Sequence, residues 1–241
     1  FKQKTAYEIK ECDWSSDVCS SDLLREPNYG WDMFVKICGI TSEEDALLAV
    51  ALGADAIGFV FAPSPRQIAP TKALDIVKRL PSDVITVGVF RDEHPKRVLE
   101  IARSARLKGL QLHGHEPLEA VQEVSREVRF AIKAVVAGSD SARRAADFGT
   151  DVILVDNAKP GSGERFDWTL LEELPTGLRI MLSGGLNPSN VREAILTTRP
   201  WGVDVSSGVE RTPGVKDAVK MRQFITAARD AQAVLGDDII D

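Results

Sequence analysis

Two residues whose side chains can move protons each stand at the end of a mainly apolar run. Cys38 follows residues 35–37 and precedes a glycine, and Asp156 follows residues 152–155. A thiolate can serve as a general base and a carboxyl group as a general acid. A cysteine can also be only a small buried hydrophobic residue, and a loop aspartate can be only a helix cap. The pattern therefore predicts an acid–base pair and leaves two structural alternatives open.

Three further polar residues stand near the ends of other apolar runs. Arg66 lies in a proline-flanked loop, where its guanidinium group could hold a carboxylate or remain solvated. His113 either orients a ligand or is a hydrogen-bonded core histidine. Asp204 precedes two serines and could orient substrate hydroxyl groups or support a neighbouring side chain. We expect these three residues to contribute to substrate binding.

Two glycine-rich turns give a stronger signal, at residues 183–187 and 206–210. Each would present unpaired backbone N–H groups close to a helix N-terminus, which is a favourable place for a phosphate group. Two tight turns that bind nothing are the alternative. The residues that we expect to bind phosphate are Gly184, Gly185, Ser206, Ser207 and Gly208.

The elements that must position these residues alternate regularly from residue 34 onward. Strands are predicted at 34–38, 56–61, 84–90, 109–113, 130–135, 152–155, 179–182 and 202–205. Helices are predicted at 43–52, 71–80, 95–105, 117–127, 141–148, 168–174, 188–198 and 215–231.

Eight strand–helix units predict an α/β fold, a single (β/α)8 TIM barrel, whose functional residues gather at the carboxyl ends of the strands. A doubly wound open sheet is the second choice, since it usually carries its glycine-rich turn after the first strand. Here the glycine-rich turns follow the seventh and eighth predicted strands, and a third glycine-rich segment, 157–163, could close over a substrate.

Residues 1–32 show no helical or strand periodicity and are rich in serine, aspartate and cysteine. The run 13–23 resembles the translation of a sequencing-library adapter. We expect residues 1–32 to be a non-native or disordered extension, with residues 33–241 as the catalytic barrel. A genuine flexible extension is the alternative, and Cys12 and Cys19 carry no functional weight in either case.

Composition restricts the partners. The net charge of −6 does not favour nucleic acid or an anionic membrane surface, and no apolar run approaches the roughly 20 residues of a membrane span. Three cysteines without zinc-type spacing favour a reduced, cytoplasmic setting. With no metal-ligand, Walker or dinucleotide motif, we expect no cofactor, no metal and a small phosphorylated substrate. A monomer and a homodimer both remain open.

Short motifs in a fixed order resemble those of the phosphoribosylanthranilate isomerase family. They are KICGIT (36–41), GFVF (58–61), SPR (64–66), VGVF (87–90), QLHG (111–114), GSG (161–163), FDW (166–168), SGGL (183–186), DVSSGVE (204–210) and PGVKD (213–217). The resemblance spans nearly all of the chain from Met33 onward.

The resemblance implies an Amadori rearrangement in tryptophan biosynthesis, which converts N-(5′-phosphoribosyl)anthranilate to 1-(2-carboxyphenylamino)-1-deoxyribulose 5-phosphate. It implies that Asp156 protonates the furanose ring oxygen and that Cys38 removes the C2′ proton, without a cofactor. Arg66 would hold the anthranilate carboxylate, and the two glycine-rich turns the phosphate. Gln67 and Asn157 depart from the family's commonest residues, which bears on substrate affinity rather than on the type of reaction.

Other functions of a phosphate-binding barrel are the alternatives. A non-catalytic sugar-phosphate-binding barrel would need only the glycine-rich turns. An epimerase would need a metal site or paired aspartates, and a related synthase a catalytic lysine at a strand end. Lys133, inside the predicted fifth strand, is the residue that would suit the synthase.

Overall fold

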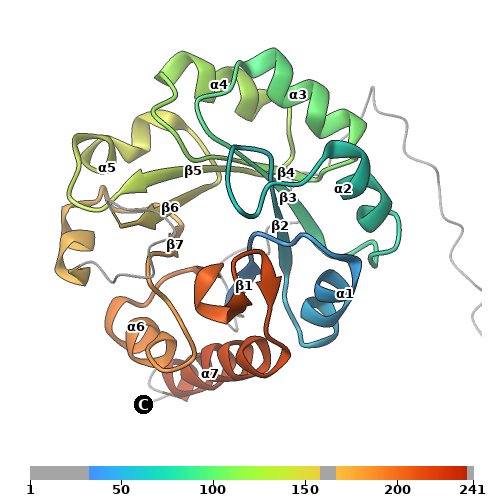
Figure 1. The fold of residues 1–241 in the computed structure, drawn as a ribbon. Coiled ribbons are helices and arrows are strands. Elements are labelled where there is room, and N and C mark those ends of the chain that lie inside the picture. The colour runs from blue at the N-terminus through green and yellow to red at the C-terminus, as the bar shows by residue number, and fades with distance from the viewer. Residues whose placement is uncertain (1–32, 158–166, 238–241) are drawn as a thin grey trace, which may run out of the picture.

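Eight parallel strands surround a common axis in the computed structural model, which describes residues 33–157 and 167–237 (Figure 1). The strands are β1 (Phe34–Ile37), β2 (Ala56–Val60), β3 (Ile85–Phe90), β4 (Gly109–Leu112), β5 (Ala131–Val136), β6 (Val152–Asp156), β7 (Ile180–Leu182) and β8 (Gly202–Val205). Each strand pairs with the next, and β8 pairs with β1. The predicted barrel is therefore confirmed, and the open sheet is excluded. Residues 1–32 and most of the glycine-rich segment 157–163 lie outside the described residues.

Helices ring the barrel, as Figure 1 shows. They are α1 (Glu43–Ala51), α2 (Pro70–Val77), α3 (Pro95–Ser104), α4 (Leu118–Arg126), α5 (Asp140–Arg143), α6 (Val191–Thr198) and α7 (Ala218–Asp237), with 3-10 turns η1 (Ala145–Phe148), η2 (Trp168–Glu173) and η3 (Ser207–Val209). In the part of the chain that the structure describes, no helix combines the length and apolarity needed to cross a membrane.

Three predicted helices differ from the observed ones. The stretch 141–148 is divided between α5 and η1, and it ends at Gly149, whose φ is +62°. The stretch 168–174 forms η2, a 3-10 helix that Asp167 caps by accepting from the N–H of Thr169. The last helix starts at Ala218 rather than at residue 215, because a turn at Gly214 joins β9 (Glu210–Thr212) to β10 (Val215–Lys216).

Strand alternation decides which side chains face the barrel interior, because successive residues of a strand point to opposite sides. Val35 and Ile37 of β1 pack among the helices, so Phe34 and Lys36 point inward. The lower interior is apolar, with the ring of Phe34 stacked 4.5 Å from that of Trp201. The polar inward residues lie closer to the carboxyl ends of the strands, above this apolar layer.

Lys133 points in the other direction. Its β5 neighbours Ile132 and Ala134 belong to the interior cluster, so Lys133 faces the helices. There its ammonium group donates to Glu116 Oε2 at 2.8 Å and to the carbonyl oxygen of Gly114 at 2.8 Å. Glu116 in turn accepts from the N–H of Gly114. This buried ion pair holds the loop that follows β4, and it does not place a lysine in the barrel's interior as a synthase would require.

We expect Lys133→Met to destabilise the fold by about 3–5 kcal/mol, because it leaves the Glu116 carboxylate buried without its cation. Urea unfolding followed by circular dichroism measures this change. The double variant Lys133→Met/Glu116→Gln should recover part of the loss. Lys78→Met, which removes a half-exposed lysine on the helical surface, should stay within about 0.5 kcal/mol of the parent protein. An equally small effect for Lys133→Met would contradict the structural role.

Candidate active site at the carboxyl ends of the strands

Cys38 and Asp156 both reach the carboxyl end of the barrel interior. Cys38 directly follows β1 in the inward phase of Lys36, and Asp156 is the last residue of β6; each is only 6% exposed. Two glycines make room for their reactive atoms. A Cβ at Gly58 would lie 2.8 Å from the Cys38 sulfur, and a Cβ at Gly184 would lie 2.9 Å from Asp156 Oδ1. Cys38 and Asp156 therefore have room only because residues 58 and 184 carry no side chain.

Lys36 is the centre of the polar interior and has no exposed surface. Its ammonium group donates to Asp204 Oδ1 at 2.7 Å and to Gln111 Oε1 at 2.9 Å. Burial alone would lower the pKa of Lys36, but the charges of Asp204 and Cys38 outweigh it, so the pKa lies above its usual value. Lys36 is therefore a permanent cation inside the barrel.

The Cys38 thiol lies beside this cation. Burial raises the pKa of Cys38, and the Asp204 carboxylate raises it further. Lys36 and Lys216 oppose the shift, Lys36 through both its charge and a hydrogen bond, but the net direction remains upward. The unliganded protein therefore carries Cys38 mainly as the thiol at neutral pH, with two cations placed to stabilise a thiolate when one forms.

Asp156 is held at both oxygens. Oδ1 accepts the N–H of Asn157 at 2.7 Å, and Oδ2 lies 3.1 Å from His113 Nε2. The other ring nitrogen of His113, Nδ1, lies 2.7 Å from Gln111 Nε2. His113 is thus neither a solvated surface residue nor an isolated core histidine, since it connects Gln111 to Asp156.

Arg66 meets a carboxylate of the protein itself. Its Nε and Nη2 donate to the two carboxylate oxygens of Glu210, each at 2.8 Å. A Cβ at Gly39 would lie 2.6 Å from Arg66 Cδ, so the side chain crosses the turn that follows Cys38. Only the Nη1–Nη2 edge of the guanidinium group is left for a ligand carboxylate. The neighbouring Gln67 donates its side-chain amide to the Phe61 carbonyl oxygen.

Lys216 connects the loops around Cys38. Its ammonium group donates to the carbonyl oxygens of Cys38 at 2.6 Å and Ser206 at 3.1 Å, and to Glu210 Oε1 at 2.9 Å. Burial lowers the pKa of Lys216 despite the adjacent carboxylate. For Glu210, burial would raise the pKa, but Arg66 and Lys216 hold it below its usual value.

The two glycine-rich turns lie side by side at the same end of the barrel. Gly184 and Gly185 adopt φ values of +76° and +73°, which glycine tolerates best. A Cβ at Gly208 would fall onto the Leu186 carbonyl oxygen, so the two turns touch through their main chains. The buried hydroxyl oxygen of Ser206 has no hydrogen-bond partner among the described residues. These features suit a small anion.

Sequence reasoning missed four charged or amide residues of this site: Lys36, Gln111, Glu210 and Lys216. A signal existed for the first two, because a lysine or glutamine between apolar strand neighbours is seldom buried without a partner. Glu210 and Lys216 gave no such signal. They meet only because the β9–β10 hairpin folds back on itself.

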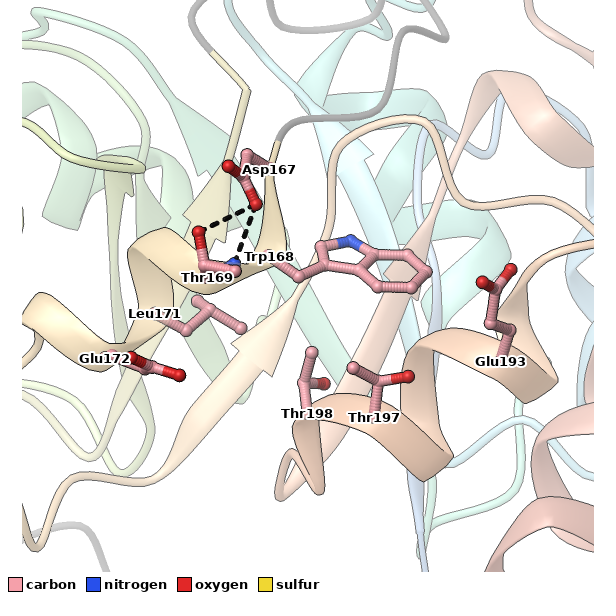
Figure 2. A pocket seen from close by; sticks show the side chains of 8 residues that line it. All are labelled: Asp167, Trp168, Thr169, Leu171, Glu172, Glu193, Thr197 and Thr198. Carbon is pink, nitrogen blue, oxygen red and sulfur yellow. Dashed lines mark hydrogen bonds between the residues drawn. The ribbon is translucent and has the colours of Figure 1, made fainter.

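A separate cavity of about 720 Å³ lies between η2 and α6, away from these residues (Figure 2). The Trp168 indole reaches across it toward α6, which contributes Glu193, Thr197 and Thr198. None of the predicted site residues lines it. Across residues 33–157 and 167–237, no three histidine, cysteine or carboxylate side chains are grouped to hold a metal ion.

Comparisons with known proteins agree on one family. The sequence model described as N-(5′-phosphoribosyl)anthranilate (PRA) isomerase matches residues 35–227. The N-(5′-phosphoribosyl)anthranilate isomerase of Desulforudis audaxviator is 48% identical over 204 residues, which are 82% of this chain and 98% of that protein. That of Thermotoga maritima is 47% identical over 201 residues, 81% of this chain and 98% of the relative.

Solved structures give the same result. The phosphoribosyl anthranilate isomerase of Thermus thermophilus superposes with a TM-score of 0.76 at 46% identity, covering 84% of this chain and all of that one. A phosphoribosyl anthranilate isomerase in complex with reduced 1-(o-carboxyphenylamino)-1-deoxyribulose 5-phosphate superposes with a TM-score of 0.73 at 43% identity, covering 83% of this chain and 100% of that one.

We expect Cys38 to ionise above the range of an ordinary thiol, about pH 8.5, because burial outweighs the two cations. The measurement is the iodoacetamide alkylation rate against pH, read by mass spectrometry, with Cys12 and Cys19 replaced by serine. The rate should rise with pH through a midpoint above that value. Lys36→Met should move the midpoint further upward, whereas Lys78→Met should leave it in place. A midpoint below pH 8 would contradict this assignment.

Proposed function

Since the chain belongs to the phosphoribosylanthranilate isomerase family, we propose that Cys38 is the general base of its reaction and Asp156 the general acid. The reaction is the Amadori rearrangement of N-(5′-phosphoribosyl)anthranilate to 1-(2-carboxyphenylamino)-1-deoxyribulose 5-phosphate in tryptophan biosynthesis. It is an isomerisation, so every proton that one group supplies must be matched by a proton that another removes.

The proposed sequence of proton transfers begins at the ring oxygen. Asp156 donates its proton there as the C1′–O bond breaks, which gives an open-chain Schiff base and an Asp156 carboxylate. In the fraction of molecules whose Cys38 thiol has lost its proton to solvent, the thiolate then removes the C2′ proton and becomes the thiol. The electron pair moves toward the iminium nitrogen to give an enolamine. Protonation at C1′ and loss of the C2′ hydroxyl proton give the ketone. Each positioned group contributes about 10²–10⁴-fold to the rate.

The observation that carries this assignment is the placement of the two residues at one end of the barrel, each beside groups that stabilise its charged form. The Asp156 carboxylate accepts the N–H of Asn157 at Oδ1, and its Oδ2 lies 3.1 Å from His113 Nε2. The cations Lys36 and Lys216 stabilise a Cys38 thiolate. Buried charges and hydrogen bonds of this kind act strongly because little water competes with them.

We further propose that the substrate's two anionic ends lie on opposite sides of Cys38. The free edge of Arg66 would hold the anthranilate carboxylate, and Asp204 would contact the ribose portion. His113, whose ring nitrogens face Gln111 and Asp156, would contact the ribose through its ring carbons. Asp204 Oδ1 accepts from Lys36 and Oδ2 accepts from the Ser183 hydroxyl group at 3.4 Å, and each oxygen has a further lone pair for a substrate hydroxyl group. The proposed phosphate ligands are Gly184, Gly185, Ser206, Ser207 and Gly208.

We expect Cys38→Ser and Asp156→Asn each to lower kcat by about 10²–10⁴-fold while the fold stays intact, because each removes one proton carrier. Turnover is followed by the loss of phosphoribosylanthranilate fluorescence, with the labile substrate made in situ. Circular dichroism checks the fold.

The chain offers matched controls for both substitutions. The double variant Cys12→Ser/Cys19→Ser should keep the parent rate, and so should Asp75→Asn, whose side chain is 75% exposed. Parent rates in both Cys38→Ser and Asp156→Asn would remove the proposed mechanism. That result would mean that neither side chain carries a proton in the reaction.

The division of the chain at residue 33 is also a proposal, with residues 33–241 as the catalytic barrel. It is supported by the family match, which lies wholly within residues 35–227. A chain that begins at Met33 should show a kcat/KM within about twofold of the full chain, because the barrel and its site are unaltered. A large loss would assign residues 1–32 a functional role.

We also propose a compartment and an oligomeric state. A reactive thiol in the site favours a reducing compartment, which we take to be the cytoplasm. We propose a monomer or a homodimer. The Thermotoga maritima isomerase, for which a structure of monomers derived from a dimeric enzyme is known, supports considering both states.

A further inference from the structure

We propose that Gln111 is a positioning residue that fixes the tautomer of His113. In this arrangement the imidazole carries its hydrogen on Nε2, donates it to Asp156, and has no nitrogen free to take the proton that Asp156 must deliver. The inference deepens the proposed function and rests on the role of Asp156 as the general acid.

The Lys36 ammonium group can donate hydrogen bonds but cannot accept them. Its position 2.9 Å from the Gln111 amide requires that the amide oxygen, not the nitrogen, face it. The strong pairing with Asp204 at 2.7 Å keeps Lys36 charged, so it cannot turn into an acceptor. The Gln111 amide therefore directs its oxygen toward Lys36 and its nitrogen away from it.

The nitrogen end of the same amide faces His113. Gln111 Nε2 lies 2.7 Å from His113 Nδ1, and an amide NH₂ group can only donate. Nδ1 must therefore be the acceptor and carry no hydrogen. A ring with hydrogen on both nitrogens would set two donors against each other at this distance.

The neutral ring then carries its hydrogen on Nε2, which lies 3.1 Å from Asp156 Oδ2. Two hydrogen bonds in series, from Lys36 to Gln111 and from Gln111 to His113, and the 3.1 Å contact between His113 Nε2 and Asp156 Oδ2 thus connect the buried ammonium group to the proposed acid. The side of Asp156 that faces His113 receives a hydrogen and cannot deliver one there. Since Oδ1 accepts the N–H of Asn157, the acidic proton has the substrate as its acceptor.

The consequence for the reaction concerns where the proton goes and what remains afterwards. With both ring nitrogens engaged, His113 does not compete with the substrate's ring oxygen for the proton. Once the proton has left, the Asp156 carboxylate keeps the hydrogen bond from Asn157 and receives the Nε2–H of His113 at its other oxygen. His113 is therefore a fixed donor, and Gln111 acts only through it.

The first test needs no substitution at Gln111. In ¹⁵N-histidine-labelled protein at pH 7.5, the His113 ring should show one hydrogen, on Nε2, in two-dimensional ¹H–¹⁵N spectra. The chain has three histidines, and His113→Gln assigns the signal. Exposed His115, whose Nδ1 lies 4.0 Å from Asp92 Oδ2, serves as the internal reference for a solvated ring. A His113 ring with hydrogen on Nδ1, or on both nitrogens, overturns the proposal.

The second test reverses donor and acceptor between residue 111 and His113 Nδ1, with a substitution that keeps the shape of the side chain. In Gln111→Glu, the carboxylate can accept from both Lys36 and an Nδ1–H, so the His113 ring should gain a second hydrogen. The doubly protonated ring would hold Asp156 as its carboxylate. We expect kcat to fall about 10–100-fold with KM changed less than about threefold, because the acid loses its proton while binding is kept.

Gln122→Glu on α4 is the matched control, since the Gln122 amide donates to the Asp147 carbonyl oxygen on the outer helical layer. It should keep the parent kcat and the parent His113 spectrum. A parent kcat in folded Gln111→Glu overturns the positioning role, and if that variant does not fold, the spectrum of the unaltered protein still decides. Parent activity in Asp156→Asn would refute the acid role itself and leave the tautomer of His113 as a separate result.

Discussion

One buried ammonium group imposes order on the interior of this barrel. Lys36 has no exposed surface, so its charge must be met by protein groups. Asp204 is directly opposite it in the β1–β8 pairing that closes the barrel, and Gln111 reaches it from β4. A one-residue slip of that register would turn Lys36 toward the helices and leave Asp204 alone. The β1–β8 pairing that closes the barrel therefore also brings Lys36 and Asp204 of the site together.

Two further buried lysines act in the same manner on loops. Lys133 holds the segment after β4 that begins with His113, and Lys216 joins the turns after β1 and β8. Buried ion pairs of this kind seldom stabilise a protein more than well-packed apolar residues would. Their effect here is positional, since each lysine fixes backbone carbonyl oxygens next to a residue of the site. These buried lysines thus define the conformation of the loops, although apolar residues in their place could make the barrel more stable.

Much of the fold and of the candidate site could be predicted from the sequence, because the carboxyl ends of the strands in a barrel converge. Cys38, Asp156 and the glycine-rich turns stood out through residue type and place alone, and the regular alternation of elements predicted the closed sheet. The helix predicted at 141–148 is interrupted at Arg144, whose φ and ψ are −105° and 18°, and the segment 168–173 winds as a 3-10 helix. The α-helix and the 3-10 helix differ little in backbone dihedral angles, so residue types do not distinguish them. The partnership of Arg66 with Glu210 could not be foreseen, because it depends on a hairpin that brings distant positions together.

The contact between Gly208 and the Leu186 carbonyl oxygen bears on how this barrel could acquire another substrate. Main chain, not side chain, sets the spacing of the two turns, so no single substitution can widen the space between them. Exchanges at Gln67 alter the opposite end at little risk to the fold, whereas exchanges at Arg66 remove one of the two cations that neutralise the buried Glu210. Divergence toward new activities should therefore keep a terminal phosphate and vary the group attached to the far end of the sugar.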